Sequence, residues 1–169
     1  MDICVRKPLI VTCGTDKFIR VWNYEERSIE TYKSFNEEAY CVSFHPSGFH
    51  IVVGLSDRLR LMNICVHNNS IKHYKEIVPF RGCREIKFSN GGQYFAAVNG
   101  TNTNQLIHVY RFYTVDNPPN LIFKGHTGRI RCIAWSKDDT ILASCGADGM
   151  ICAWRIASDS DGVRKIELH

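Results

Sequence analysis

The chain of 169 residues lacks several features that define membrane, secreted and disordered proteins. It has no run of 18 or more apolar residues, so no membrane-spanning helix is expected. Charges appear early in Met1 to Pro8, which is not the pattern of a secretory signal. Hydrophobic residues make up 44% and charged residues 22%, which excludes disordered and collagen-like chains. We therefore expect one globular domain of ordinary size.

The chain also lacks a strong excess of either charge. Its 21 basic and 17 acidic residues give a formal net charge of +4. A dedicated nucleic-acid-binding protein usually carries a basic stripe or arm. The nearest candidates, residues 58–60 and 129–131, alternate arginine with an apolar residue and are typical of the solvated face of a strand. Nucleic-acid binding is therefore not the leading expectation.

Eight cysteines are present, but no two of them form a Cys-x-x-Cys pair. The nearest two, Cys145 and Cys152, are seven residues apart, whereas zinc sites usually need short ligand pairs. Most of the cysteines lie in apolar, strand-like runs, where a free thiol behaves as a small hydrophobic side chain. We predict buried reduced thiols, no disulfide, no metal and no cofactor. Reduced thiols indicate the cytosol, the nucleus or the ciliary interior.

No segment has a long 3.6-residue periodicity, so almost no helix is expected. Instead, the chain repeats itself: residues 10–22 align without gaps with residues 142–154, and looser copies occupy 52–62 and 94–110. The last strand of each copy ends at Trp22, Met62, Tyr110 and Trp154, with spacings of 40, 48 and 44 residues. These spacings are close to the period of a four-stranded propeller blade.

A second strand lies upstream in each copy. Residues 40–44, 84–88 and 131–135 align with one another, and residues 3–5 fit the same position. Turn signals at 46–48, 90–92 and 137–139 lie where a hairpin needs them. The sequence thus predicts an all-β fold of four WD40-type β-propeller blades, each of four antiparallel strands, in a single unit that is a partial propeller. The expected blades cover about 1–36, 37–79, 80–124 and 125–169.

Four side chains of the last copy, His126, Ser144, Asp148 and Trp154, carry a resemblance to the WD-repeat family. In that family they form a hydrogen-bonded tetrad within the blade. An indole N–H, a hydroxyl, an imidazole and a carboxylate can satisfy one another when buried. The first copy retains three of the four positions, with Thr12, Asp16 and Trp22.

The middle copies depart from this pattern. Phe35 aligns with His126, and Met62 replaces the tryptophan of the second copy. Pro79 and Tyr110 take the corresponding places in the third copy. We expect packing to hold these two blades.

The same serine, histidine and aspartate nominally form a catalytic triad. A nucleophilic triad needs an exposed hydroxyl beside an oxyanion hole, whereas the repeat explains these positions structurally. No phosphate-binding or dinucleotide-binding fingerprint is present. We predict that the protein is not an enzyme and has no catalytic residue.

A second resemblance extends over nearly the whole chain. Several short sequence segments resemble the second propeller of a family of long cilia- and flagella-associated WD-repeat proteins. These segments are residues 38–40, 45–48, 58–63 and 95–100. The resemblance implies the axoneme of the cilium or flagellum, or the cytoplasm, and a link to dynein-arm placement or to the regulation of motility. Members of that family continue into coiled coils. This chain has no coiled-coil heptads, so we expect either a fragment or a short gene product.

The leading functional prediction is a scaffold that binds other proteins, axonemal or dynein-associated. Loops on a rigid scaffold concentrate binding residues, and tyrosine and arginine are enriched among binding hot spots. The candidate partner-binding residues are Glu37, Glu38, Tyr40, Arg81, Arg84, Arg129 and Arg131. The alternative is an RNA-binding or phosphopeptide-binding module that uses the four arginines of this set.

Four blades are few for a WD-repeat propeller that closes into a ring. Propellers have 4–8 blades, and WD-repeat propellers usually close at seven or eight. Four blades shaped for a larger ring would leave apolar faces open beside residues 3–5 and 130–135. We predict a homodimer that completes an eight-bladed ring. The competing prediction is that these blades continue a larger propeller.

Overall fold

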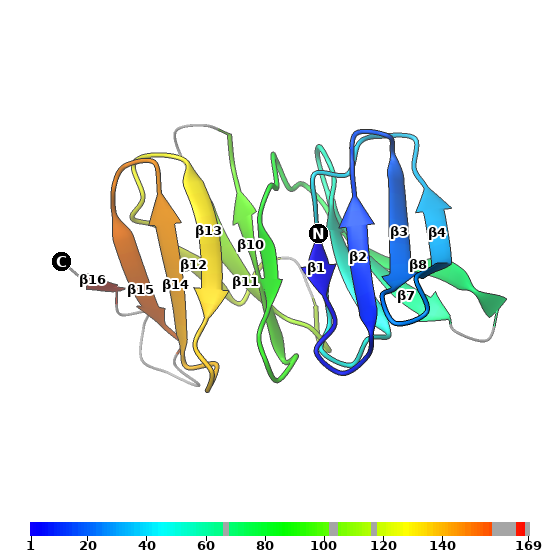
Figure 1. The fold of residues 1–169 in the computed structure, drawn as a ribbon. Helices are drawn as coiled ribbons and strands as arrows, with labels where there is room; N and C mark the ends of the chain where they lie inside the picture. Colours follow the sequence, from blue (N-terminus) through cyan, green and yellow to red (C-terminus); the bar gives the residue numbers. More distant parts are fainter. Residues whose placement is uncertain (66–67, 102–104, 116–117, 157–164, 168–169) are drawn as a thin grey trace. The chain divides into compact units, whose positions relative to one another are not determined.

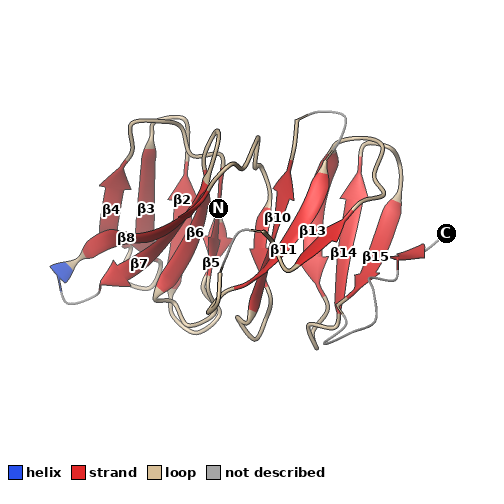
Figure 2. Ribbon diagram, turned by 180° about the vertical axis from the view of Figure 1, so that it is seen from behind, coloured by secondary structure: helices blue, strands red, loops and turns tan. Residues whose placement is uncertain are grey.

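The computed structural model describes the chain except for residues 66–67, 102–104, 116–117, 157–164 and 168–169. Strands dominate the described residues, and no α-helix is found among them. The strands form four-stranded antiparallel sheets in which consecutive strands are neighbours (Figures 1 and 2). This is the all-β, propeller-blade architecture predicted from the repeat, and the fold class is confirmed.

The first two sheets are named blade 1 and blade 2. Blade 1 contains β1 (Asp2–Ile3), β2 (Leu9–Cys13), β3 (Phe18–Asn23) and β4 (Ser28–Ser34). Blade 2 contains β5 (Cys41–Phe44), β6 (His50–Gly54), β7 (Leu59–Cys65) and β8 (Ser70–Ile77). A register shift interrupts the β3–β4 ladder at Val21/Trp22, and another interrupts β7–β8 at Leu61/Met62. Both bulges therefore lie next to the residue at which the repeat places its tryptophan.

The last two sheets are blade 3 and blade 4. Blade 3 contains β9 (Ile86–Phe88), β10 (Tyr94–Asn99), β11 (Leu106–Arg111) and β12 (Leu121–Phe123). Blade 4 contains β13 (Ile130–Trp135), β14 (Ile141–Gly146), β15 (Ile151–Arg155) and β16 (Lys165–Glu167). The chain divides into two compact units, Met1–Ile86 and Lys87–His169, and the division falls inside β9. Each unit is described by itself.

The core of the first unit lies between blades 1 and 2. From blade 1, Val11, Ile19 and Val21 contribute fully buried side chains. They belong to one apolar cluster with Ile51, Val53 and Met62 of blade 2. Alternation along β3 is strict, because every second residue is buried and the residues between are only half-buried. Blade 1 thus packs through one face only, as a period of two along a strand requires.

The core of the second unit lies between blades 3 and 4. Trp154 of β15 stacks on Phe123 of β12, with ring centroids 5.0 Å apart and an interplanar angle of 11°. Ile133 and Leu142 belong to the same buried cluster. An offset aromatic pair of this kind adds to the energy of area burial. The last tryptophan of the repeat is therefore the largest side chain of this core.

Carboxylates near strand ends tie neighbouring blades together. In the first unit, the Asp2 carboxylate accepts hydrogen bonds from the Ser43 hydroxyl at 2.8 Å and from the Phe44 backbone N–H at 2.9 Å. In the second unit, the Asp139 carboxylate accepts bonds from the backbone N–H groups of Asn90 and Gly91 at 2.7 and 2.6 Å. These bonds fix the position of one hairpin against the strand or turn of the next blade.

Candidate functional site

Blade 4 brings its four tetrad side chains together. The Trp154 indole N–H donates to Ser144 Oγ at 2.8 Å, and His126 Nε2 lies 2.8 Å from the same hydroxyl. His126 Nδ1 is 2.9 and 3.1 Å from the two oxygens of Asp148. Because a carboxylate only accepts, the network assigns the imidazole proton to Nδ1 and leaves Nε2 to accept from the Ser144 hydroxyl. Ser144 is almost fully buried, so its hydroxyl is not placed to attack a substrate.

Backbone N–H groups also donate hydrogen bonds to Asp148, the last member of the tetrad. Burial alone would raise the pKa of the Asp148 carboxyl, but hydrogen bonds from His126 and from the N–H groups of Met150, Thr127 and Gly128 outweigh it. The pKa therefore lies well below its usual value. Gly146 makes the approach possible, because a Cβ there would lie 2.7 Å from His126 Nδ1 and 2.5 Å from Asp148 Oδ1.

Blade 1 assembles only part of the corresponding set. The Trp22 indole N–H donates to Thr12 Oγ1 at 2.9 Å, which reproduces the tryptophan–hydroxyl bond of blade 4. Asp16 does not join them. Its carboxylate accepts from Arg20 at 2.6 Å and from the Phe18 N–H at 3.2 Å, at the exposed turn. The reason is that no imidazole stands between this carboxylate and Thr12, so the acid pairs with the nearest cation instead.

The two middle blades use other contacts at the tryptophan position. Met62 in blade 2 and Tyr110 in blade 3 are both almost fully buried. Tyr110 stacks on Phe95 at 5.2 Å, and its hydroxyl lies 3.3 Å from His108 Nδ1. Sequence reasoning missed His108, because nothing in the repeat pattern distinguishes this histidine from an exposed one.

In the first unit, three segments converge on the loops that lead into blade 2 and away from it. They are residues 37–40, 56–58 and 80–84, named here the loop cluster. The Ser56 hydroxyl donates to Glu37 Oε2 at 2.6 Å, while the Ser56 carbonyl accepts from the Gly82 N–H at 3.2 Å. The Phe80 N–H donates to the Asp57 carbonyl at 2.9 Å. Backbone bonds therefore hold candidate residues from separate parts of the sequence in one place.

Tyr40 and Arg84 are the pair of candidate residues that the structure joins most directly. The Arg84 guanidinium lies over the Tyr40 ring, 5.0 Å from its centroid. Tyr40 is half-buried and Arg84 is exposed, so the pair presents an aromatic edge and a cation to solvent. Arg81 is also exposed, and Glu38 is half-buried. Tyrosine and arginine are the residue types that most often dominate protein–protein interfaces.

Glu37 has a second role that its sequence position does not reveal. It faces Arg58, whose guanidinium lies 2.7 Å from Asp57, 3.5 Å from Glu76 and 3.8 Å from Glu37. The hydrogen bond from Arg58 holds the pKa of Asp57 below its usual value. A hydrogen bond of 2.5 Å from Arg60 likewise holds the pKa of Glu76 below its usual value. This ion-pair network braces the loop cluster, so Glu37 supports the site as well as lining it.

The remaining candidates, Arg129 and Arg131, belong to the second unit. Arg129 is half-buried, and its backbone carbonyl accepts from the Ala147 N–H at 2.7 Å. Arg131 is exposed, at the register shift between Ile130 and Cys132. Both flank the turn that carries Asp148.

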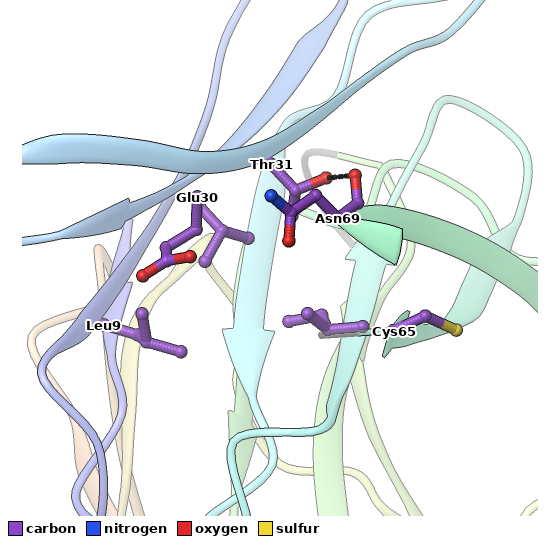
Figure 3. Close-up of a pocket in the computed structure, with 7 residues that line it drawn as sticks. Leu9, Glu30, Thr31, Cys65 and Asn69 are labelled. Atoms are coloured by element: carbon purple, nitrogen blue, oxygen red, sulfur yellow. Dashed lines mark hydrogen bonds between the residues drawn. The ribbon is translucent and has the colours of Figure 1, made fainter. Parts of the chain in front are cut away.

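A small cavity lies in the first unit between the outer strands of blades 1 and 2 (Figure 3). Its volume is about 30 Å³, and Thr31 closes it by donating to the Asn69 carbonyl at 2.7 Å. Pockets for drug-sized ligands have volumes of about 300 Å³ or more, so this cavity is too small for one. In the described part of the chain, no three His, Cys, Asp or Glu side chains are grouped to hold a metal ion.

The cysteines of the described residues are all free thiols. Cys83 of the loop cluster approaches Cys41 of β5, with sulfur atoms 3.6 Å apart, and both are buried. A hydrogen bond with Cys83 and burial raise the pKa of the Cys41 thiol. Burial also raises the pKa of Cys13, to about 11. These two thiols are therefore protonated at neutral pH and have little nucleophilic character.

Four-stranded meanders repeated at a period near 44 residues, with a tryptophan–hydroxyl–imidazole–carboxylate chain in the last of them, define a WD-repeat protein. The family model "WD domain, G-beta repeat" matches residues 1–23 and 117–155, which fall in blade 1 and around blade 4. The chain therefore carries WD40 repeats. Blade 2 and strands β9 to β11 of blade 3 lie outside the matched residues.

Over nearly its whole length the chain is similar to cilia- and flagella-associated proteins. It is 61% identical over 163 residues to cilia- and flagella-associated protein 57 C of Tetrahymena thermophila and 48% identical over 167 residues to cilia- and flagella-associated protein 57 of Mus musculus. These alignments cover 94% and 99% of the chain, but only 12% of each relative. Echinoderm microtubule-associated protein-like 2 of Mus musculus is 29% identical over 170 residues, covering 93% of the chain and 24% of the relative.

No helix among the described residues is long and apolar enough to cross a membrane.

Proposed function

We propose that the chain is a non-enzymatic interaction module of a ciliary or flagellar scaffold, located in the axoneme, and that it binds axonemal or dynein-associated proteins. The observation that carries this proposal is the Tyr40–Arg84 pair on the braced loop cluster. Similarity to proteins named for cilia and flagella supports an association with the cilium or flagellum. A role in dynein-arm placement or in the regulation of motility is the specific form of this proposal.

The physical case rests on rigidity. The strands of blades 1 and 2 share one buried core, and loops on such a scaffold lose little conformational entropy when they bind. Ion pairs and backbone bonds hold the three loop segments together before any partner arrives. A partner with an acidic group near an apolar patch would fit the exposed guanidinium and aromatic edge.

The test is affinity capture from salt-extracted axonemes with the tagged full-length chain, followed by mass spectrometry. We expect axonemal proteins to be enriched with the wild-type chain and reduced at least about tenfold with Arg84→Ala, since central arginine hot spots have effects of this size. Tyr40→Ala should act in the same direction. Arg111→Ala is the matched control, because Arg111 is an exposed arginine at the end of β11.

Circular dichroism checks that each variant is folded before capture is compared. Equal capture of axonemal proteins by the wild-type chain and by folded Arg84→Ala would contradict the role of the loop cluster. Enrichment of ribonucleoproteins, with affinity for generic RNA that falls steeply with salt, would favour the RNA-binding alternative instead.

A further inference from the structure

Two cysteines next to the Tyr40–Arg84 pair bring their sulfur atoms into contact. Cys41 directly follows Tyr40 and begins β5. Cys83 directly precedes Arg84 in the segment between β8 and β9. The two sulfur atoms lie 3.6 Å apart, and the Cys41 sulfur is also 3.4 Å from the Cys83 carbonyl oxygen. The thiols therefore join two parts of the chain that are 42 residues apart, at the residues that carry the candidate binding pair.

The backbone around the two thiols is arranged for this close contact. Gly54 of β6 is the register partner of Cys41. A Cβ on Gly54 would clash with the Cys41 sulfur and would lie 3.1 Å from the Cys83 Cβ. The Gly54 carbonyl also accepts a hydrogen bond from the Tyr40 N–H at 2.9 Å, which fixes the residue before β5. A glycine at this position is therefore what lets the two thiols meet.

The repeat does not require a cysteine at position 83. In the alignment of the strands that open each blade, Cys83 has Ala39 and Ile130 as its counterparts. Both counterparts are buried apolar side chains, as Cys83 is. Because apolar side chains of different size fill this position in the other copies, packing alone does not explain a thiol that faces Cys41.

We propose that Cys41 and Cys83 form a modification site, at which hydrogen peroxide converts the two thiols into a disulfide that fastens segment 80–84 to β5. A disulfide bond is about 2.05 Å long, so the sulfur atoms have to approach by about 1.6 Å. Segment 80–84 lies outside the strands and supplies this shift, while the β5–β6 ladder holds Cys41. The free thiols of the structure are the resting form, since disulfides inside cells are typically transient and redox-sensing.

The oxidation consumes one molecule of hydrogen peroxide in two steps. Because a hydrogen bond with Cys83 and burial raise the pKa of the Cys41 thiol, we assign the first attack to Cys83. Its sulfur loses the thiol proton and bonds to one peroxide oxygen, the O–O bond breaks, and the departing hydroxide takes up the proton as water. The Cys41 sulfur then attacks the sulfenic sulfur of Cys83, the S–O bond breaks, and the departing hydroxide takes the Cys41 proton as a second water. The two thiols together lose two electrons, which reduce the peroxide.

The loop cluster controls access to these buried thiols. The Phe80 N–H bonds to the Asp57 carbonyl and the Gly82 N–H to the Ser56 carbonyl, which holds segment 80–84 closed. Local opening of a loop costs less free energy than global unfolding. Hydrogen peroxide is also much smaller than an alkylating reagent, so a partial opening of the segment admits the oxidant first.

The test is treatment of the purified, reduced full-length chain with hydrogen peroxide at neutral pH. Free thiols are then blocked, and the chain is digested without reductant for mass spectrometry. We expect a peptide pair linked through Cys41 and Cys83, lighter by two hydrogen atoms than the free peptides, which dithiothreitol separates. Cys152→Ser is the matched control, because Cys152 is as fully buried as Cys83 but lies in the second unit. It should leave the linked pair unchanged.

Two further measurements test the order of the steps and the effect on the loop. Cys41→Ser, or Cys41→Ala if the serine variant does not fold, should accumulate a sulfenic acid on Cys83 that dimedone traps. Cys83→Ser should give on the order of tenfold less trapped product at Cys41. In the oxidised wild-type chain, backbone N–H groups of segment 80–84 should exchange with deuterium on the order of tenfold more slowly than in the reduced chain, because the cross-link restricts opening.

A folded, peroxide-treated chain without the Cys41–Cys83 link would overturn the proposal, as would a link that forms only in urea. Dimedone trapped chiefly at Cys41 would overturn the assigned first step. Hydrogen exchange in segment 80–84 that oxidation leaves unchanged would overturn the fastening of the loop. Since none of these measurements uses an axonemal partner, their outcome does not depend on the proposed binding function.

Discussion

At the scale of single residues, two tryptophans with the same place in the repeat differ most in burial. Trp154 is 1% exposed and stacks on Phe123, whereas Trp22 is only half-buried. Both donate an indole N–H to a hydroxyl at nearly the same distance. The local bond therefore depends on the blade itself, and the burial depends on whether a second blade lies against it.

This difference predicts unequal costs of truncation. Trp154→Ala should lower the free energy of unfolding by about 3–5 kcal/mol, because it removes a large core side chain and leaves Ser144 without its donor. Met62→Ala should cost less, since methionine loses less volume and no hydrogen bond. Trp22→Ala should cost least, because Trp22 is only half-buried. Urea denaturation measures all three, and an equal loss for Trp22→Ala and Trp154→Ala would contradict the argument.

The carboxylate of the tetrad predicts a dependence on pH. The pKa of Asp148 is lower in the folded protein than in the unfolded chain, so the ionised form stabilises the fold. This stability is fully present above the unfolded pKa of about 3.9 and is lost as the pH falls toward the lower folded value.

The measurement is the difference in free energy of unfolding between the wild-type chain and Asp148→Asn. It should be constant from pH 7 to about pH 5 and should shrink below about pH 4. Asp16→Asn is the matched comparison. The hydrogen bond from Arg20 also lowers the pKa of Asp16, but this carboxylate is exposed, so its effect should have the same sign and be smaller. If the difference in free energy of unfolding between the wild-type chain and Asp148→Asn grew on acidification, the predicted direction of the pH dependence would be wrong.

At the scale of elements, hairpin turns carry the polar contacts between neighbouring blades. Asp139 closes the β13–β14 turn with a φ of 58° and reaches across to the turn before β10. The Asn90 amide donates both to the Asp139 carboxylate, at 2.8 Å, and to the Ser136 carbonyl, at 2.8 Å. Two turns about 50 residues apart in the sequence thus satisfy each other.

Removing the Asp139 side chain should loosen this contact. Asp139→Gly keeps the positive φ accessible and isolates the loss of the carboxylate, so we expect a cost of about 1–2 kcal/mol. A double-mutant cycle with Asn90→Ala should give a coupling energy clearly different from zero, because the two residues touch. Asp139→Gly combined with Thr12→Ala, in the other unit, should be additive. If the effects of Asp139→Gly and Asn90→Ala were additive, the proposed coupling between the two turns would be contradicted.

At the scale of the whole molecule, thiol reactivity reports which parts of the fold are buried. Under native conditions Cys132 should react first, because it is exposed, and Cys83 and Cys152 should react only after unfolding. Cys13 should react slowly at neutral pH because its pKa is about 11.

Mass spectrometry of labelled peptides measures these rates, and elemental analysis checks the expectation that no stoichiometric zinc is bound. Labelling of Cys132 no faster than that of Cys152 in the folded chain would contradict the exposure of Cys132. Rapid labelling of Cys83 in the folded chain would contradict its burial.

The sequence by itself determined the blade architecture, the order of the strands and the membership of the tetrad in blade 4. These features follow from hydrogen bonds between strands adjacent in the chain and from the alternation of side chains, both of which leave a short period in the sequence. The match between residues 10–22 and 142–154 was enough to locate both tryptophan–hydroxyl bonds.

Only the tertiary structure decided which equivalent positions behave alike. Asp16 and Asp148 share a repeat position, yet one pairs with an exposed arginine and the other with a buried histidine. Glu37 belongs to an ion-pair network with residues about 20 and 40 positions away, and Asp2 reaches Ser43 of another blade. Burial and ion pairing depend on which neighbour lies against a strand or turn, and that neighbour comes from a distant part of the chain, where no periodic signal marks the partner.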